Sequence, residues 1–296
     1  PEEDDMSTLD EYLLSLSATD LAGNVGGGKS ADLVTFDTTE TQLLLAMTDN
    51  AFSPNGNRVK DTISISPVTQ TKDVISYDFS IRDDKGNVVY SKKENKKLPV
   101  NFVWNGNDKD NIRCKDGMYS AHLSVIAANG STAAAATQLF ELDTVEPKLT
   151  AEIPWTYFSP DGDGNQDDLP VKIIESTKEK LWTADIRDVK RKSVKKYSWN
   201  GTKESFVWNG TDESGNPAKN GKYTLMIYST DDAGNSFNTE ISNIVLDNRE
   251  TKIYLTAENE GISPNNDSVL DMQIFTIRTT VKDDLLCQYD MEFDMF

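Results

Sequence analysis

Residues 206–225 read Phe206-Val-Trp-Asn-Gly-Thr-Asp-Glu-Ser-Gly-Asn-Pro-Ala-Lys-Asn-Gly-Lys-Tyr-Thr-Leu225. Short apolar runs at the two ends of this stretch are separated by clusters of Asn, Asp and Gly, a pattern that is typical of strands joined by tight turns. The first five residues recur as Phe102-Val-Trp-Asn-Gly106, 104 positions earlier. The stretch therefore predicts a β-hairpin that has been copied along the chain.

Two further landmarks keep the same register. A linker sequence that begins at Asp37 returns at Asp143 and at Asp247, at intervals of 106 and 104 residues. A Ser-Pro loop recurs at those same intervals. Because separate landmarks share one period, the chain is predicted to consist of tandem modules. The first, second and third Ser-Pro loops are Phe52-Ser-Pro-Asn-Gly-Asn-Arg-Val-Lys-Asp61, Phe158-Ser-Pro-Asp-Gly-Asp-Gly-Asn-Gln-Asp167 and Ile262-Ser-Pro-Asn-Asn-Asp-Ser-Val-Leu-Asp271.

Within each repeat, apolar and polar residues alternate with a period of two, as in 75–81 and 119–125. About seven such strands in about 105 residues predict an all-β fold of tandem Ig-like β-sandwiches. We expect an acidic linker with the C-terminal tail of a truncated unit at 1–42, complete units at 43–147 and 148–251, and the N-terminal part of another unit at 252–296.

The composition excludes several classes of protein. Thirty Lys and Arg residues against 49 Asp and Glu residues give a formal net charge of −19 among 296 residues, which repels nucleic acids and anionic lipids. No apolar run is long enough to predict a membrane-spanning helix. Cys114 and Cys287 are the only cysteines and His122 is the only histidine, so neither a disulfide framework nor a Cys/His zinc site is expected.

The 206–225 stretch resembles the bacterial Ig-like domain family named for the flagellar hook-capping protein FlgD, which also occurs in secreted subtilisin-like proteases of the Vpr type. The resemblance rests on Trp208-x-Gly-x-Asp212, a Gly turn, and a Gly-x-Tyr223 start of a strand. The first copy departs from the pattern, with Asn111 in place of Gly215, and Asn is the next best residue for a left-handed turn. The resemblance implies an accessory module of an envelope or secreted protein and not a catalyst.

The second Ser-Pro loop carries the candidate metal ligands. Asp161, Asp163, Asn165 and Asp167 place carboxylate or amide oxygens at alternate positions, and two intervening glycines let the backbone turn these oxygens toward one point. A hard cation requires such oxygen ligands, so we expect a weak structural Ca²⁺ site. The alternative interpretation is an Asx-rich turn without a metal.

The other two Ser-Pro loops are weaker candidates for the same ion. The EF-hand pattern is not met in the second loop, since Gln166 and Lys172 stand where Gly and Glu are required. The first loop offers a single carboxylate and the third offers two. Their candidate ligands are Asn55, Asn57 and Asp61 in the first loop and Asn265, Asp267 and Asp271 in the third.

One motif points to a function that its context does not support. Residues 23–30, Gly23-Asn-Val-Gly-Gly-Gly-Lys-Ser30, satisfy the P-loop pattern of nucleotide-binding proteins. A P-loop requires a helix after it, whereas residues 31–37 align with a closing strand of the next repeats. No nucleotide, catalytic centre or other cofactor is therefore expected.

Three functions remain open. The preferred one is a non-enzymatic structural or adhesive spacer of a bacterial envelope, periplasmic or extracellular protein, with calcium stiffening the array. The second is an accessory module of a secreted hydrolase, such as a protease, whose catalytic domain lies outside this stretch. The third is a hook-cap-like scaffold for flagellar assembly, which rests on family analogy alone. Neighbouring Ig-like units are the expected partners, and the sequence does not identify another protein or cell-surface partner.

Overall fold

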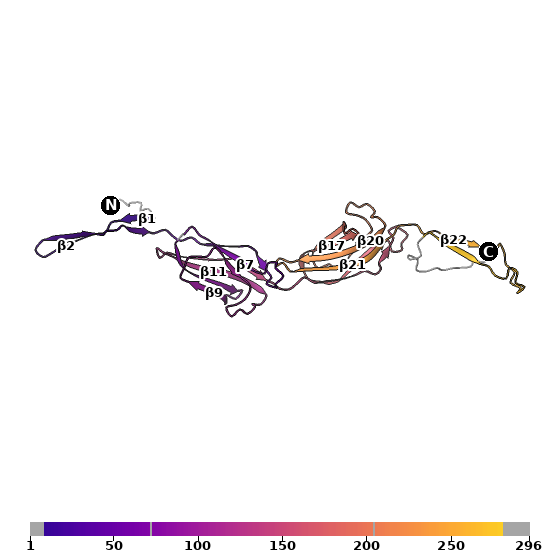
Figure 1. Ribbon diagram of the computed structural model, residues 1–296, viewed down its shortest axis with the longest axis horizontal. Helices are drawn as coiled ribbons and strands as arrows, with labels where there is room; N and C mark the ends of the chain where they lie inside the picture. The colour runs from indigo at the N-terminus through magenta and orange to yellow at the C-terminus, as the bar shows by residue number, and fades with distance from the viewer. Residues whose placement is uncertain (1–8, 72, 204, 281–296) are drawn as a thin grey trace. The chain divides into compact units, whose positions relative to one another are not determined.

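The computed structural model describes residues 9–71, 73–203 and 205–280, and these residues form strands without any helix (Figure 1). The contacts divide the chain into two compact units. The first unit comprises Pro1–Pro147 together with Thr230–Phe237, and the second comprises Lys148–Ser229 together with Asn238–Phe296. Each unit contains a two-sheet sandwich, so the predicted all-β, tandem Ig-like fold is confirmed.

The sandwich of the first unit packs a three-stranded sheet against a larger one. Neighbouring strands are antiparallel except for the short parallel pair β6 and β13. The smaller sheet has the order β10 (Phe102–Trp104), β7 (Ile63–Val68), β5 (Leu44–Met47). The larger sheet has the order β6 (Ala51–Phe52), β13 (Phe140–Leu142), β11 (Gly117–Ala127), β8 (Val74–Asp83), β9 (Val88–Glu94), and β12 (Thr132–Ala136) also pairs with β11.

The second sandwich repeats this topology. Its short strand β15 is again parallel to the last strand of the repeat, β21. The smaller sheet has the order β14 (Leu149–Glu152), β16 (Leu169–Ser176), β19 (Ser205–Trp208). The larger sheet has the order β15 (Tyr157–Phe158), β21 (Ser236–Leu246), β20 (Gly221–Thr230), β17 (Glu179–Asp188), β18 (Ser193–Gly201).

Both sandwiches contain more strands than the alternation predicts. The additional strands β6 and β15 are only two residues long, and they lie directly before the Ser-Pro loops. A segment of two residues cannot show alternation, so sequence periodicity does not detect it.

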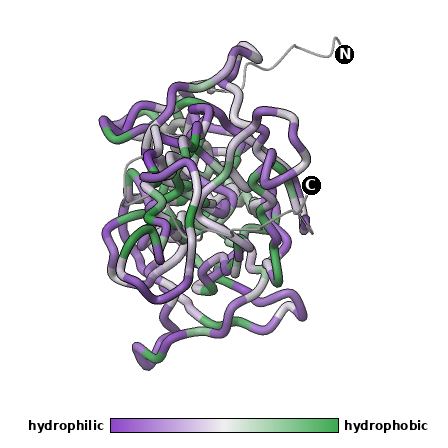
Figure 2. Tube along the Cα trace, turned by 90° about the vertical axis from the view of Figure 1, so that its right-hand side faces the viewer, coloured by the Kyte–Doolittle hydropathy of each residue, from purple (hydrophilic) through white to green (hydrophobic). Residues whose placement is uncertain are grey.

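The period of two places one face of each strand in the core. Along β11, alternate side chains from Tyr119 to Val125 are buried. Figure 2 shows hydrophobic and hydrophilic stretches interspersed along the Cα trace. The core of the first sandwich includes a parallel ring stack of Phe79 on Phe102, with centroids 4.0 Å apart. Burial of these apolar faces supplies the main stabilisation of each sandwich.

The repeated tryptophans anchor the two hairpins. Trp104 and Trp208 are buried, and each indole Nε1 donates a hydrogen bond to a backbone oxygen three residues ahead, of Asn107 at 2.7 Å and of Thr211 at 2.9 Å. The N–H group of a buried indole usually has such a partner. The tryptophans are therefore core residues that also stabilise the turns that follow them in the chain.

The Gly-x-Tyr element has an equally specific role. The Tyr119 hydroxyl donates to the Lys115 backbone oxygen at 2.6 Å, and Tyr223 makes the equivalent bond to Lys219. Asn111 has a φ of 61° and Gly215 a φ of 83°, so the Asn copy of the turn keeps the left-handed conformation, as predicted.

Three strand pairs flank the sandwiches. Three of the four glycines of the P-loop-like motif, Gly26, Gly27 and Gly28, lie in extended strand β3 (Val25–Lys29), which is antiparallel to β2 (Ser15–Thr19). Strand β4 (Val34–Asp37) follows and pairs with β1 (Leu9–Tyr12). This strand context does not form the phosphate cradle that nucleotide binding needs. Toward the other end, β22 (Ile253–Ala257) pairs with β23 (Phe275–Thr279), and residues 281–296 of the predicted last unit lie outside the described residues. Within the described part of the chain, no helix could cross a bilayer.

Candidate functional site

The three Ser-Pro loops share one backbone conformation. In each loop, the serine N–H donates across the loop to a backbone oxygen seven residues ahead, of Lys60, Gln166 or Leu270, at 2.8–2.9 Å. Every second residue within each loop has a positive φ, between 50° and 90°. These left-handed residues are Gly56, Arg58 and Lys60 in the first loop, Gly162, Gly164 and Gln166 in the second, and Asn266, Ser268 and Leu270 in the third.

This alternation turns successive N–H groups toward one point and forms a backbone nest, a concavity that binds anions. The anion is supplied by the chain itself. In the second loop, the Asp167 carboxylate accepts the N–H of Gly162 on Oδ1 at 2.8 Å and that of Gly164 on Oδ2 at 2.9 Å. Asp61 and Asp271 fill the corresponding nests of the other loops in the same way. The last aspartate of each loop is therefore the residue that closes it.

The remaining candidate ligands cap the backbone two residues ahead. In the second loop, Oδ1 of Asp161 accepts the Asp163 N–H at 3.2 Å, and Oδ1 of Asp163 accepts the Asn165 N–H at 2.7 Å. Asn55 and Asn57 make the same bonds in the first loop, so an amide oxygen serves as well as a carboxylate. The loop conformation thus requires Asx side chains and does not require their charge.

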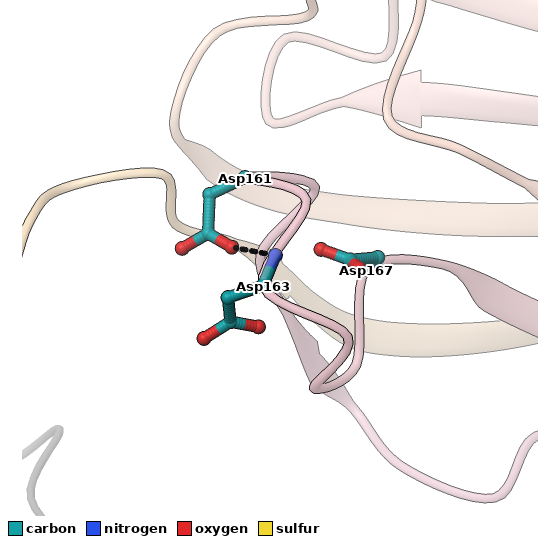
Figure 3. Close-up of side chains that lie close together, drawn as sticks. All are labelled: Asp161, Asp163 and Asp167. Carbon is teal, nitrogen blue, oxygen red and sulfur yellow. Dashed lines mark hydrogen bonds between the residues drawn. The ribbon is translucent and has the colours of Figure 1, made fainter.

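Three carboxylates converge in the second loop. Asp161, Asp163 and Asp167 each offer one oxygen, and these oxygens all lie within 4.8 Å of one another. Figure 3 shows Asp161 and Asp163 next to each other, with Asp167 across the loop. Asp161 and Asp163 are exposed, whereas Asp167 is half-buried. The sequence analysis singled out these three residues, and the structure brings them together.

The donor set of this cluster fits Ca²⁺ chemistry. Ca²⁺ takes six to eight oxygen ligands, and each carboxylate has lone pairs beyond those that accept N–H groups. The three carboxylates would hold the ion, with water completing the shell. Asn165 contributes its backbone N–H to the loop through the bond to Asp163.

The first and third loops differ from the second in charge and in side-chain contacts. The first loop has Asp61 as its single carboxylate, and its two oxygens accept nest N–H groups as those of Asp167 do in the second loop. In the third loop, the Asn265 Nδ2 group donates to Asp267 Oδ2 at 3.0 Å. The first loop is less suited to an ion than the second because it has one carboxylate, and the third because an amide competes with a cation for a carboxylate oxygen.

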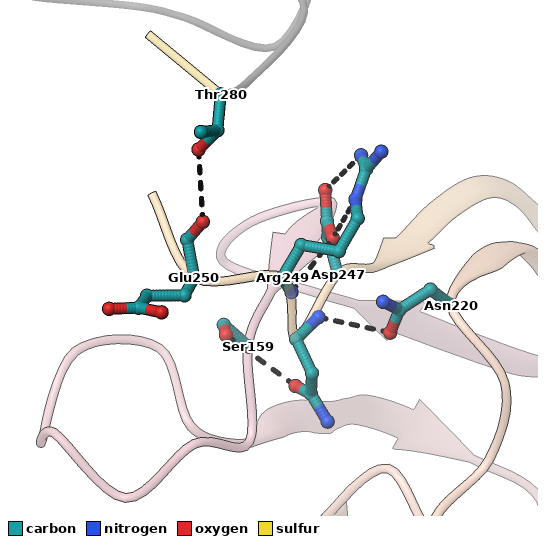
Figure 4. Close-up of polar contacts among 7 residues, drawn as sticks. Ser159, Asn220, Asp247, Arg249, Glu250 and Thr280 are labelled. Carbon is teal, nitrogen blue, oxygen red and sulfur yellow. Dashed lines mark hydrogen bonds and ion pairs between the residues drawn. The ribbon is translucent and has the colours of Figure 1, made fainter. Parts of the chain in front are cut away.

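The second Ser-Pro loop also contacts the linker that follows its sandwich. Figure 4 shows Ser159 beside this linker, where its hydroxyl lies 3.5 Å from Asn248 Oδ1 and the Asn248 N–H donates to Asn220 Oδ1 at 3.0 Å. Arg249 pairs with Asp247 through Nε at 2.7 Å and Nη2 at 2.6 Å. The Arg249 hydrogen bonds lower the pKa of Asp247, which keeps this linker aspartate ionised.

Comparison with protein families identifies part of the chain. Residues 165–233 match the family model of the FlgD Ig-like domain. The resemblance that residues 206–225 carry is therefore confirmed. A second family model, the CHU_C type IX secretion signal domain, matches residues 46–138 in the first sandwich. No curated protein sequence matches the chain.

Solved structures with similar folds include tandem modules of bacterial proteins. A tetra-tandem repeat from the extending region of a large adhesion protein is 16% identical, with a TM-score of 0.31, covering 92% of this chain and 71% of that one. The fibronectin(III)-like modules of Clostridium thermocellum CbhA are 12% identical, with a TM-score of 0.39, covering 67% and 92%. A Ca²⁺-stabilised, ice-binding adhesin of an Antarctic bacterium is 13% identical, with a TM-score of 0.36, covering 84% and 59%.

Proposed function

We propose that the chain is a non-enzymatic structural or adhesive spacer, built from tandem Ig-like modules, of a bacterial protein exported to the cell envelope or beyond. The observation that carries this proposal is the repetition of one topology in two sandwiches, each with its own buried tryptophan. A module with its own complete hydrophobic core can fold independently, so it can be repeated along a chain as a spacer. The matches to an Ig-like domain and to a type IX secretion signal domain support the exported location.

Single-molecule stretching of the whole chain tests the spacer function. Because each sandwich of about 105 residues folds around a separate core, we expect two unfolding events, each lengthening the chain by roughly 35 nm. Refolding between pulls is also expected, since a load-bearing spacer must recover. A single event that releases both repeats together would contradict the proposal.

We further propose that Ca²⁺ binds the second Ser-Pro loop and stabilises it. For an affinity of about 10⁻⁴–10⁻³ M, as in extracellular modules, 10 mM Ca²⁺ is expected to raise the free energy of unfolding of the second sandwich by about 1–3 kcal/mol. Calorimetry with and without Ca²⁺, and with excess EDTA, measures this shift.

The first loop provides the matched control for the calcium experiment. The double variant Asp161→Asn, Asp163→Asn gives the second loop the amides that Asn55 and Asn57 supply in the first loop, so its backbone bonds are retained while two charges are removed. We expect this variant to fold and to lose the response to Ca²⁺. An unfolding temperature of the unmodified chain that is indifferent to Ca²⁺ and EDTA would contradict the calcium proposal and leave the spacer function unaffected.

A further inference from the structure

The first Ser-Pro loop has a partner within the first compact unit. The turn Asp231-Asp-Ala-Gly-Asn235 belongs to that unit and lies on the loop. The Asn55 Nδ2 group donates to Asn235 Oδ1 at 3.0 Å, and the Lys60 ammonium donates to the Asp232 backbone oxygen at 2.9 Å. The Asn235 Nδ2 group in turn donates to the Asp143 backbone oxygen, also at 2.9 Å. Residues about 90 and 180 positions apart in the sequence are thereby tied together.

The contact buries the turn, whereas Asn55 and Lys60 of the loop remain exposed. Asn235 is fully buried and Ala233 is 1% exposed, although both lie in a turn. Ser53 in the loop is fully buried, whereas its equivalent Ser159 in the second loop is only half-buried. A Cβ atom added to Gly234 would lie 2.9 Å from the Val59 side chain, so the turn and the loop are in close steric contact.

The chain carries a second copy of this turn, which serves as an internal reference. In Asp231–Asn235, the first aspartate accepts both the N–H (2.9 Å) and the Nδ2 group (2.8 Å) of the last asparagine. Asp20-Leu-Ala-Gly-Asn24 makes the same two bonds at the same distances. The φ angles of Gly234 and Gly23 are 91° and 87°. Asn24 is nevertheless exposed, and a Cβ added to Gly23 would meet no atom within 4 Å. The two turns therefore share their internal structure and differ in their surroundings.

We propose that the first Ser-Pro loop is a docking site for the Asp-x-Ala-Gly-Asn turn, and that the residue after Ser-Pro decides what such a loop binds. Asn55 can donate to the turn, whereas a carboxylate at this position cannot donate. The second loop has Asp161 there and, on the calcium proposal above, would take a cation, while Asn55 makes the first loop a protein-recognition site. The ligand of the first loop is thus a segment of protein with a buried asparagine and two small residues before it.

The electrostatics of Asp143 agree with a docked turn. Burial raises the pKa of Asp143, and the nearby carboxylates of Asp231 and Asp116 raise it further. At the equivalent linker positions, hydrogen bonds lower the pKa of Asp37 and of Asp247. Of these three linker aspartates, Asp143 is the one whose backbone oxygen accepts Asn235.

Amide hydrogen exchange of the full chain, followed by mass spectrometry, tests the docking site. In the unmodified chain, amides of residues 231–236 are expected to exchange at least tenfold more slowly than those of residues 20–25, although both turns have the two bonds between the first aspartate and the last asparagine. Gly234→Ala and, separately, Asn55→Asp are expected to abolish this difference. Peptides from β8, β11, β17 and β20 report whether the sandwiches of each variant remain folded.

Gly23→Ala is the matched control, because it has the same left-handed strain without a neighbour to displace. We expect it to leave exchange of residues 231–236 unchanged. Equal exchange in the two turns of the unmodified chain would overturn the proposal. It would also be overturned if Asn55→Asp, in a folded chain, left residues 231–236 as protected as before.

Discussion

Replacing Trp208 with alanine is expected to lower the free energy of unfolding of the second sandwich by about 3–5 kcal/mol. The indole is fully buried between Phe158 and Tyr223, whose ring centroids lie 5.1 and 5.0 Å from that of Trp208. Its N–H group donates a hydrogen bond to the Thr211 backbone oxygen. Alanine would leave a cavity among these rings and an unpaired carbonyl. Calorimetry should show one of two transitions moving to much lower temperature.

Trp104→Ala supplies the reciprocal experiment in the first sandwich. This tryptophan packs on Phe52 and Tyr119 in the equivalent positions. We expect it to lower the other transition and to leave the second sandwich at its original stability, with exchange of amides in β11 and β20 assigning the transitions. If either variant lowered both transitions equally, the two sandwiches would share one folding unit, and their description as separate modules would be wrong.

Replacing Gly210 with alanine is expected to have the second largest effect. Gly210 has a φ of 69°, and an added Cβ atom would lie 2.6 Å from the Pro160 ring and 3.0 Å from the Leu246 side chain. Both neighbours are held in place, Pro160 by the second Ser-Pro loop and Leu246 by the core. The variant should lose about 1–3 kcal/mol to overpacking, in addition to about 1–2 kcal/mol for the left-handed backbone.

Gly215→Ala separates these two contributions. Gly215 has a φ of 83°, and an added Cβ would meet no atom within 4 Å. It should therefore show the backbone cost alone, measured as a shift of the urea midpoint at an unchanged slope. If the two variants were equally stable, the close approach of Gly210 to Pro160 would have no energetic consequence.

The repeat, the strands and the hairpin turns could be predicted because their determinants are local. Alternation over β8 and β11, the tryptophan before an Asn-Gly turn, and the tolerance of Asn111 for a left-handed conformation are all visible within a few residues. The strand that follows the P-loop-like motif could be predicted for the same reason, since the residues after Ser30 have a strand pattern.

The candidate site could be predicted only in part. The alternating Asx residues identified the second loop, and the convergence of its three carboxylates followed from that spacing. The sequence did not show that the last aspartate of each loop fills a backbone nest, because left-handed residues such as Arg58, Lys60 and Gln166 are of types that do not signal this conformation. Docking of Asn235 on Asn55 was also missed, since a contact across 180 positions leaves no local pattern.

The self-supplied anion has a consequence for the proposed function of an exported protein. A loop that depended on a divalent ion for its shape would unravel whenever the surrounding fluid lost that ion, and the exposed backbone would become a target for proteolysis. Here the carboxylates of Asp61, Asp167 and Asp271 stabilise the loops by accepting hydrogen bonds from their backbone N–H groups. Asn and Asp can therefore replace each other at the earlier positions of a Ser-Pro loop during evolution. Such substitutions change what the loop binds and leave its backbone conformation and the sandwich intact.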